Sequence, residues 1–411
     1  MMILDRRILY IVTGAALALF LSAACLLTLP SAAGAGGWKV VRTWGGHGSG
    51  PGEFRTPRGV AVDDQGYVYV VDTFNNRIQK FTANGRFMTT WGRRGTGDGE
   101  FRLPGRLAVG PDQLLYVTDC DNHRVQVFTR GGKFVRSWGS RGRGQGQFSF
   151  PRGIALDARG LVYVSEEGNS RVQVFTADGR FLRMWGQRGT GRGQFSLPKG
   201  LSCGSDGRVY VADTYNNRIQ VFTAAGSWLR TFGSLGRATG HFDRPRAAWP
   251  NPQGRIFVAD TYNHRIQQFT RDFRFVRQWG CYGSAPGQFA GPRALATALD
   301  GTLYVVDTAN HRVQRFARDL SADNTPPSTT CSAPARWSPA PVLATLSATD
   351  DEGAVTATYW RLGSEAPFAL YATPIVVDIP GQTLLEFFSV DAAGNQEDLR
   401  SRRLYVDAND D

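Results

Sequence analysis

The chain has 411 residues, is 42% hydrophobic, 12% aromatic and 20% charged, and carries a formal net charge of +12. This composition excludes a disordered protein, a coiled coil and a polytopic membrane protein. Its 49 glycines follow no G-X-Y period and favour turns in a β-rich protein, while its five cysteines form no C-x-x-C pair, which excludes a zinc ribbon or RING-type module.

Residues 1–37 have the features of an export segment. Arg6 and Arg7 precede an uncharged run, Ile8–Leu29, which is long enough to span a bilayer as a helix. Small residues then offer a cleavage site at Ala35. We expect either a signal anchor helix or a cleaved signal peptide, with lipidation or a twin-arginine signal as weaker alternatives. The positive-inside rule predicts a location in the cell envelope, anchored and facing outward, or secreted or periplasmic after cleavage.

The middle of the chain repeats itself every 47 residues. The phrase Asp-Thr-Phe-Asn-Asn-Arg-Ile-Gln and its variants begin at Asp72, Asp119, Glu166, Asp213, Asp260 and Asp307. A Trp-Gly or Phe-Gly pair and a proline keep the same period. The repeats cover about 41–84, 88–131, 135–178, 182–225, 229–272 and 276–319. A period of about 40–50 residues with strand patterns is typical of propeller blades.

Each repeat predicts four strands. In the first repeat these are Gly59–Val62, Tyr67–Val71, Arg77–Phe81 and Arg86–Trp91, with a hairpin turn before the last. The sixth repeat ends before its fourth strand, but Trp38–Trp44 has the sequence and register of that strand. The N-terminal strand is therefore expected to complete the last blade, which closes the ring and leaves no exposed sheet edge. The predicted fold is all-β, with a six-bladed β-propeller over residues 38–319.

The phrase D-x-x-N-[NH]-R-[IV]-Q-x-F, preceded by P-[RK]-G and a [FY]-V strand, resembles the NHL repeat. The resemblance covers about residues 41–319 and implies a six-bladed propeller. Its family includes RNA-binding propellers of TRIM-NHL proteins, extracellular sensor domains of bacterial kinases and the peptidyl-hydroxyglycine lyase. No cysteine pattern supplies a RING, so ubiquitin ligase chemistry is not carried over.

Two features of the repeat have a structural interpretation. Asp72 and its equivalents precede an arginine by five residues, and one ion pair or turn-capping hydrogen bond per blade explains both. His123, His264 and His311 share one repeat position in blades two, five and six. Blades two and five lie on opposite sides of a six-fold ring, so these histidines cannot converge on one metal ion. We expect no metal site and no cofactor in the propeller.

One face of the predicted propeller is strongly basic. Residues 38–317 carry 39 basic and 20 acidic side chains, for a net charge of +19. The D-x-x-N turns, the long interblade loops and the starts of the first strands share this face. The candidate ligand-binding residues are the basic side chains at the channel mouth and three aromatic turn residues: Arg58, Arg106, Arg152, Lys199, Arg246, Arg293, Phe74, Tyr215 and Tyr262. Such a surface suits an anionic polymer, a glycan or an acidic protein partner. Alternatively, the arginines brace carbonyl groups of the Gly-rich loops.

The tail predicts a second domain. Residues 320–328 read as a linker, and short alternating strands in 329–411 suggest an Ig-like β-sandwich. The segment Ser389–Glu397 resembles the S-x-D-x-A-G-N-x-E close of bacterial extracellular Ig-like repeats. Asp350, Asp351 and Glu352 are weak calcium candidates, and an exposed acidic turn is the favoured interpretation.

These features favour a non-enzymatic, extracytoplasmic binding or scaffold protein, held to the membrane through Ile8–Leu29. A propeller enzyme of the lyase or lactonase type is the alternative, but it needs convergent His, Glu or Asp residues on the first strands, where Val, Ala, Leu and Ser stand. A nucleic-acid-binding NHL propeller is a second alternative, which the export segment disfavours. The pairing of Cys120, Cys203, Cys281 and Cys331 and the oligomeric state stay open.

Overall fold

The structure is a computed structural model that describes residues 37–319, 328–334, 341–350, 355–364, 366–392 and 395–406. The described residues form two compact units, one spanning Lys39–Ala317 and the other including those beyond Ala317. The predicted N-terminal hydrophobic helix, most of the linker, and Asp351 and Glu352 lie outside the described residues. Among the described residues, no helix combines the length and hydrophobicity that crossing a membrane requires.

Five four-stranded antiparallel sheets of the first unit take their strands in chain order. Blade one contains β2 (Gly59–Val62), β3 (Val68–Asp72), β4 (Arg77–Phe81) and β5 (Phe87–Trp91), and blade two contains β6 (Pro104–Val109), β7 (Leu115–Asp119), β8 (Arg124–Phe128) and β9 (Phe134–Trp138). Blade three contains β10 (Pro151–Leu156), β11 (Val162–Glu166), β12 (Arg171–Phe175) and β13 (Phe181–Trp185). Blade four contains β16 (Leu201–Cys203), β17 (Arg208–Asp213), β18 (Arg218–Thr223) and β19 (Trp228–Phe232), and blade five contains β20 (Ala247–Pro250), β21 (Ile256–Asp260), β22 (Arg265–Phe269) and β23 (Phe275–Trp279).

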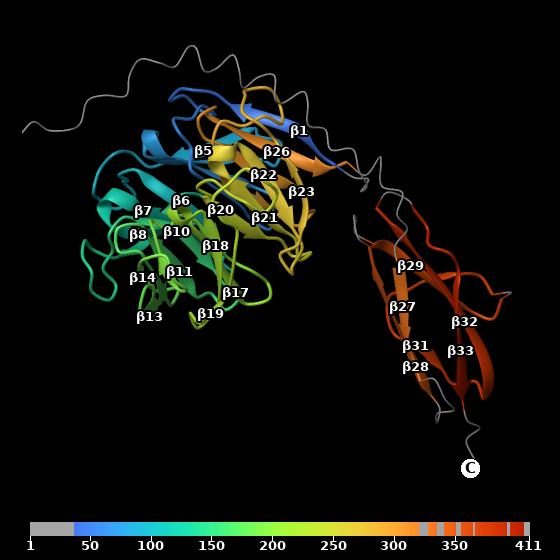
Figure 1. Cartoon of the computed structure of the whole chain (residues 1–411). Helices are drawn as coiled ribbons and strands as arrows, with labels where there is room; N and C mark the ends of the chain where they lie inside the picture. Colours follow the sequence, from blue (N-terminus) through green and yellow to red (C-terminus); the bar gives the residue numbers. More distant parts are fainter. Residues whose placement is uncertain are drawn as a thin grey trace, which may run out of the picture. The chain divides into compact units, whose positions relative to one another are not determined.

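The sixth sheet joins the two ends of this unit. Its strands are β24 (Pro292–Thr297), β25 (Leu303–Asp307), β26 (Arg312–Arg318) and the N-terminal β1 (Trp38–Gly45), and β1 pairs with β26 (Figure 1). The predicted completion of the last blade by the N-terminal strand is therefore confirmed. First strands also contact one another around the ring, and β2 of blade one lies against β24 of blade six. The six sheets thus form a closed six-bladed propeller.

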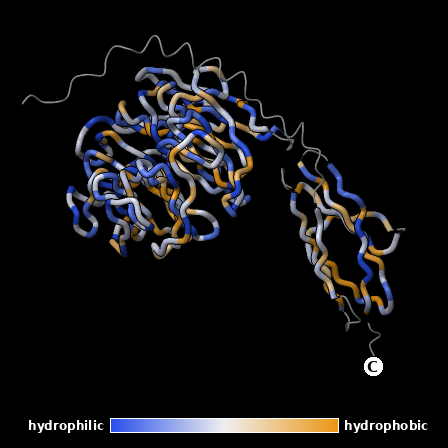
Figure 2. Tube along the Cα trace, in the orientation of Figure 1, coloured by the Kyte–Doolittle hydropathy of each residue, from blue (hydrophilic) through white to orange (hydrophobic). Residues whose placement is uncertain are grey.

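Apolar residues of neighbouring blades pack together and build the core between them, and Figure 2 shows the hydrophobic segments of the chain. The second strand of each blade is buried along its whole length in five blades and nearly so in blade four, where β17 begins at a half-buried Arg208. The Trp-Gly pairs have a packing role, because Trp44 of blade six lies over the hairpin glycine Gly85 of blade one. Gly85 has a φ of +79°, and a Cβ on it would come within 2.5 Å of the Trp44 ring. Glycine is therefore required at this turn.

Short helical turns and bridged loops complete the blades. The 3-10 turns η2 (Thr73–Asn75), η3 (Cys120–Asn122), η4 (Thr214–Asn216) and η5 (Thr261–Asn263) connect second to third strands. The interblade loop before blade four carries the parallel pair β14 (Gln187–Arg188) and β15 (Gln194–Phe195). The equivalent loops of the other blades have single parallel bridges, such as His47 with Phe54. These loops therefore have a fixed, repeated shape.

The second unit consists of two antiparallel sheets in its described part. One takes the order β27 (Ser328–Ser332), β28 (Val342–Thr349) and β31 (Ile375–Val377); the other takes the order β30 (Ala369–Leu370), β29 (Val355–Leu362), β32 (Gly381–Asp391) and β33 (Arg400–Val406). Both sheets contribute to one hydrophobic cluster, with Ala344 and Ile375 from the first and Leu385 and Leu404 from the second. Short strands, as predicted for 329–411, are therefore present in this unit. The prediction that this unit is Ig-like stays a prediction.

Candidate functional site

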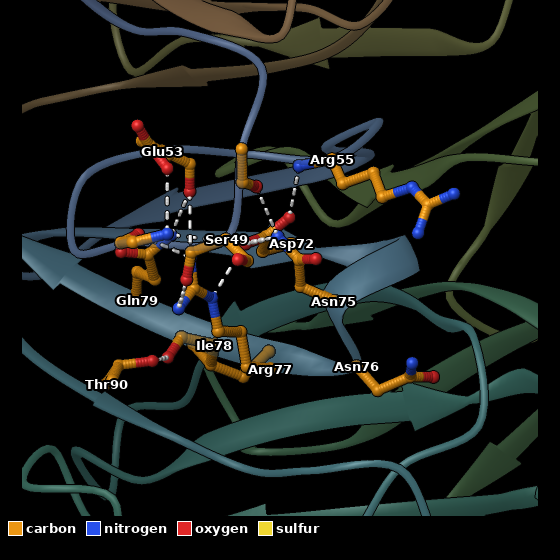
Figure 3. A network of polar contacts seen from close by, with 12 residues as sticks. Ser49, Glu53, Arg55, Asp72, Asn75, Asn76, Arg77, Ile78, Gln79 and Thr90 are labelled. Atoms are coloured by element: carbon orange, nitrogen blue, oxygen red, sulfur yellow. Dashed lines mark hydrogen bonds and ion pairs between the residues drawn. The ribbon is translucent and has the colours of Figure 1, made fainter.

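The turn between the second and third strands holds a buried ion pair in every blade. In blade one, the carboxylate of Asp72 is fully buried and lies 2.8 Å from Nε of Arg77 (Figure 3). It also accepts hydrogen bonds from the backbone N–H of Arg55 and from the side-chain amides of Asn75 and Gln79. The equivalent arginine–carboxylate distances in the other blades are 2.5 to 2.9 Å. The structural interpretation of these residues is therefore confirmed.

The same arginine fixes the interblade loop above it. Nη1 of Arg77 donates to the carbonyl of Ser49, and Nη2 donates to the carbonyls of Gly50 and Glu53. The side chain of Asn75 donates to the carbonyl of Gly48. The D-x-x-N turns and the long loops consequently lie on one face, as the strand directions predict.

The six basic side chains predicted at the channel mouth line a single cavity of about 220 Å³. Its lining residues are Arg58, Gly105, Arg106, Arg152, Lys199, Arg246 and Arg293. We call the six cations the basic ring. Each comes from the start of a first strand or from the loop directly before it, so the 47-residue period places one cation per blade around the axis. The sequence prediction named all six of these residues.

One carboxylate that sequence reasoning missed neutralises part of this ring. Glu167 follows β11 and pairs with Nε of Arg152, and its other carboxylate oxygen lies 2.5 Å from Nζ of Lys199. Burial acts to raise the pKa of Glu167, but the two cations outweigh burial and hold that pKa below its usual range. Four of the six repeats have threonine at this position and blade two has Cys120, so the departure is visible once the repeats are aligned.

Arg106 has a different role from the other members of the ring. It is one residue out of register with its equivalents, as its sequence Gly105–Arg106 predicts. Its guanidinium crosses the channel from blade two and donates from Nη2 to the carbonyls of Arg246 and Arg293 in blades five and six. Burial lowers its pKa to about 10. Arg106 therefore braces the opposite blades, and the carbonyls that it contacts belong to two other members of the basic ring and not to the Gly-rich loops.

The remaining cations, Arg246, Arg293 and Arg58, follow one another around the ring in blades five, six and one. We call these three the open arc, and Arg152 with Lys199 the neutralised arc. Among the described residues, no carboxylate pairs with the open arc, and the buried Nε atoms of its three arginines have no hydrogen-bond partner. Burial and repulsion between the arginines lower the pKa of Arg58 to about 10 and that of Arg293 to about 9.

The three predicted aromatic residues flank the arginines. The guanidinium of Arg58 lies 5.3 Å from the ring centre of Phe74, and that of Arg246 lies 5.9 Å from Tyr262. Tyr215 and Tyr262 both contact Arg244, which the sequence prediction did not name. Phe74 is 40% exposed, and Tyr215 and Tyr262 are each 45% exposed. Phe74 and Tyr262 are thus partly exposed beside arginines of the open arc, whereas Tyr215 lies beside Arg244.

Six segments of the chain match the family model described as the NHL repeat, at residues 54–81, 101–128, 148–175, 195–222, 251–269 and 289–316. The chain contains six NHL repeats. Protein lin-41 of Caenorhabditis elegans is 45% identical over 49 residues, which are 12% of this chain and 4% of that protein. This chain therefore spans only a small part of that relative's length.

Solved structures with a similar backbone share little sequence with this chain. A structural genomics protein of unknown function from Bacteroides thetaiotaomicron has a TM-score of 0.55 and 16% identity, with 69% of this chain and 76% of that chain covered. A streptogramin B lyase structure has a TM-score of 0.49 and 15% identity, with 69% of this chain and 98% of that chain covered. At these identities the similarity concerns the fold alone.

The histidines of the NHL repeats have a structural role in this propeller. Nδ1 of His264 accepts a hydrogen bond from the backbone N–H of Gly291 at 3.0 Å, and His123 and His311 accept equivalent bonds from Phe150 and Thr56. In blades one and four, the side-chain oxygens of asparagines at the same position accept this bond. Each histidine therefore ties its turn to the next interblade loop. Within the described part of the chain, no cluster of metal-ligating side chains is present.

The second unit has a buried polar network at the predicted S-x-D-x-A-G-N-x-E motif. The carboxylate of Glu397 accepts hydrogen bonds from the backbone N–H groups of Thr329 and Ser389, both at 2.9 Å. It also lies 3.0 Å from Nε of Arg400. The motif residues described here thus join β27 to β32 and have a structural function. Cys120 and Cys203 of the propeller and Cys331 of this unit are free thiols.

Proposed function

We propose that this protein is a non-enzymatic binding protein whose propeller takes up an anionic group at the channel mouth. The observation that carries the proposal is the cavity lined by six cations, two of which pair with Glu167 and three of which have no carboxylate partner among the described residues. Guanidinium groups bind carboxylates and phosphates through paired hydrogen bonds, and they do so more strongly where water is partly excluded. An anionic glycan, an anionic polymer or an acidic protein segment could supply such a group.

The exposed rim of the same face would favour the approach of such a ligand. Seven arginines of the interblade loops are exposed: Arg93, Arg94, Arg141, Arg143, Arg188, Arg192 and Arg237. Exposed charges of one sign raise the encounter rate with an oppositely charged partner. We assign binding rather than catalysis because the carboxylate at the cavity is held ionised by two cations, an arrangement that does not favour proton transfer.

We also propose an extracytoplasmic location, with the chain held to the membrane by Ile8–Leu29 or released by cleavage near Ala35. The support is the 22-residue uncharged run after Arg6 and Arg7. A reporter enzyme that functions only outside the cytoplasm, fused after Asp411, should be active. An active cytoplasm-dependent reporter at the same site would contradict this location.

Binding is tested with the full chain and an immobilised anionic glycan, polygalacturonate, with neutral dextran as the reference. Binding should occur only to polygalacturonate and should weaken as the NaCl concentration rises, because the contacts are ionic. The double variant Arg58→Gln/Arg293→Gln should weaken it by about tenfold or more. Lys133→Gln, on the hairpin face, is the matched control. Absence of binding at low salt, or equal losses in both variants, would contradict the proposed function.

A further inference from the structure

On one side of the basic ring, the cations have no carboxylate counter-charge among the described residues. Its six members stand at one repeat position or beside it, yet a carboxylate reaches only the neutralised arc in the described residues. The open arc combines three guanidinium groups from consecutive blades with buried Nε donors that have no partner. Buried donors without partners are costly, and a bound acceptor group would relieve that cost.

The neutralised arc shows how this ring binds a carboxylate. The two oxygens of Glu167 bridge cations of adjacent blades, one oxygen on Arg152 of blade three and the other on Lys199 of blade four. The equivalent positions in blades five and six are Thr261 and Thr308, whose hydroxyl groups donate to the carbonyls of Pro292 and Pro57. No side chain there supplies the bridging carboxylate, so a ligand carboxylate can take the same place between adjacent arginines of the open arc.

The surroundings of the open arc limit what carries that carboxylate. The cavity of about 220 Å³ is smaller than the usual 300–1,000 Å³ of small-molecule pockets, so it suits one small ring, such as the end residue of a longer chain. Phe74 stands beside Arg58 at one end of the arc and Tyr262 beside Arg246 at the other. Both rings are substantially exposed. The polarised C–H groups of a sugar ring pack well on the negative face of an aromatic ring.

We infer that the open arc, Arg246, Arg293 and Arg58, is the binding site for the carboxylate of a terminal acidic sugar, whose ring packs beside Phe74 or Tyr262. This inference rests on the proposed function and names its ligand class. It also predicts that the internal carboxylate and the ligand carboxylate are interchangeable, because both bridge cations of adjacent blades.

The test uses calorimetric titration of the full chain at low salt with D-galacturonate and D-glucuronate. Galactose, acetate and glucose 6-phosphate are the comparison ligands. At least one uronate should bind about tenfold more tightly than acetate and than the sugar phosphate, and galactose should not bind. Arg293→Gln should weaken uronate binding about tenfold, whereas Lys133→Gln on the hairpin face should leave it unchanged.

The bridging geometry is tested directly by introducing two residues of blade three at the equivalent positions of blade five. Blade three has Ser165 donating to the carbonyl of Lys199 and Glu167 bridging the cations, and the equivalent residues in blade five are Ala259 and Thr261. The double variant Ala259→Ser/Thr261→Glu should abolish uronate binding and raise the melting temperature. Arg293→Gln keeps the inference testable if this double variant fails to fold.

The outcomes separate the inference from the proposed function. If polygalacturonate binds but uronates bind no better than acetate, the site recognises only the negative charge of the ligand and the acidic-sugar inference is wrong. Tighter binding of glucose 6-phosphate would also overturn it, in favour of a phosphate ligand. Unchanged uronate binding by a folded Ala259→Ser/Thr261→Glu variant would contradict the location of the site on the open arc. If the unmodified chain binds none of the anions tested, the proposed function is wrong as well.

Discussion

The neutralised arc and the open arc of the basic ring are built from the same repeat position but differ in their net positive charge. Arg152 and Lys199 share Glu167, whereas Arg246, Arg293 and Arg58 have no carboxylate partner within the described residues. The difference arises from one turn residue, because threonine stands in blades five and six where blade three has Glu167. The repeat therefore places the cations, and a single departure from the repeat decides which of them are available to a ligand.

We expect the largest effect on the unfolding free energy when the carboxylate of Glu167, which creates the difference between the arcs, is removed. Glu167→Gln leaves Arg152 and Lys199 without a counter-charge, and removing one partner of a buried ion pair costs about 3 kcal/mol. Urea denaturation of the full chain should show this loss. Asp98→Asn in an exposed loop is the matched control and should have no measurable effect. An unchanged unfolding free energy for Glu167→Gln would mean that the two arcs do not differ in the way described.

Removal of one arginine from each arc should change stability in opposite directions. Arg293→Met relieves repulsion in the open arc and should stabilise the ligand-free protein by about 1 kcal/mol. Arg152→Met leaves the carboxylate of Glu167 with Lys199 alone and should destabilise the protein by about 2 kcal/mol. Thermal unfolding of both variants measures the sign. The same sign for both would remove the distinction between the arcs.

Alkaline pH should sharpen the comparison through Lys199. Burial, with repulsion from Arg152 and Arg246, outweighs Glu167 and lowers the pKa of Lys199 to about 8 from an ordinary value of 10.5. Because the folded protein releases this proton first, its stability relative to the unfolded state should rise between pH 8 and about 10.5. The rise should be smaller in Lys199→Met, in which the lowered pKa values of Arg58, Arg106 and Arg293 still contribute. A titration of Lys199 followed by NMR that gives an ordinary pKa would refute this expectation.

The smallest expected effect lies outside the basic ring and concerns the stability of the histidine turns at acidic pH. Burial lowers the pKa of His264, and its protonation would remove the acceptor for the N–H of Gly291. Its contribution to stability is therefore complete above about pH 6.5 and is lost as the pH falls through the lowered folded-state pKa. His264→Asn should preserve the hydrogen bond and reduce the acid loss by about 0.5 kcal/mol. Identical pH profiles for both proteins would exclude this role.

Most of the fold was predictable because the same pattern of strand and turn residues recurs six times with a 47-residue period. The period also places Arg58, Arg152, Lys199, Arg246 and Arg293 at the same position of five blades, so most of the cavity lining could be predicted from the spacing. The reach of Arg106 across the channel was not predictable, because it depends on the distance between blades two, five and six. Glu167 was missed because it appeared beside Glu166 as part of one variant turn, although its alignment with Thr261 and Thr308 was a readable signal.

The central claim is that an anion binds the open arc and not the neutralised arc. A crystal of the full chain soaked in selenate and measured at the selenium edge tests this claim directly, because guanidinium groups bind tetrahedral oxyanions and selenium marks their position. We expect one anomalous peak within hydrogen-bond distance of Arg246, Arg293 or Arg58. A peak between Arg152 and Lys199 instead, or an empty cavity with peaks only on the exposed rim arginines, would contradict it.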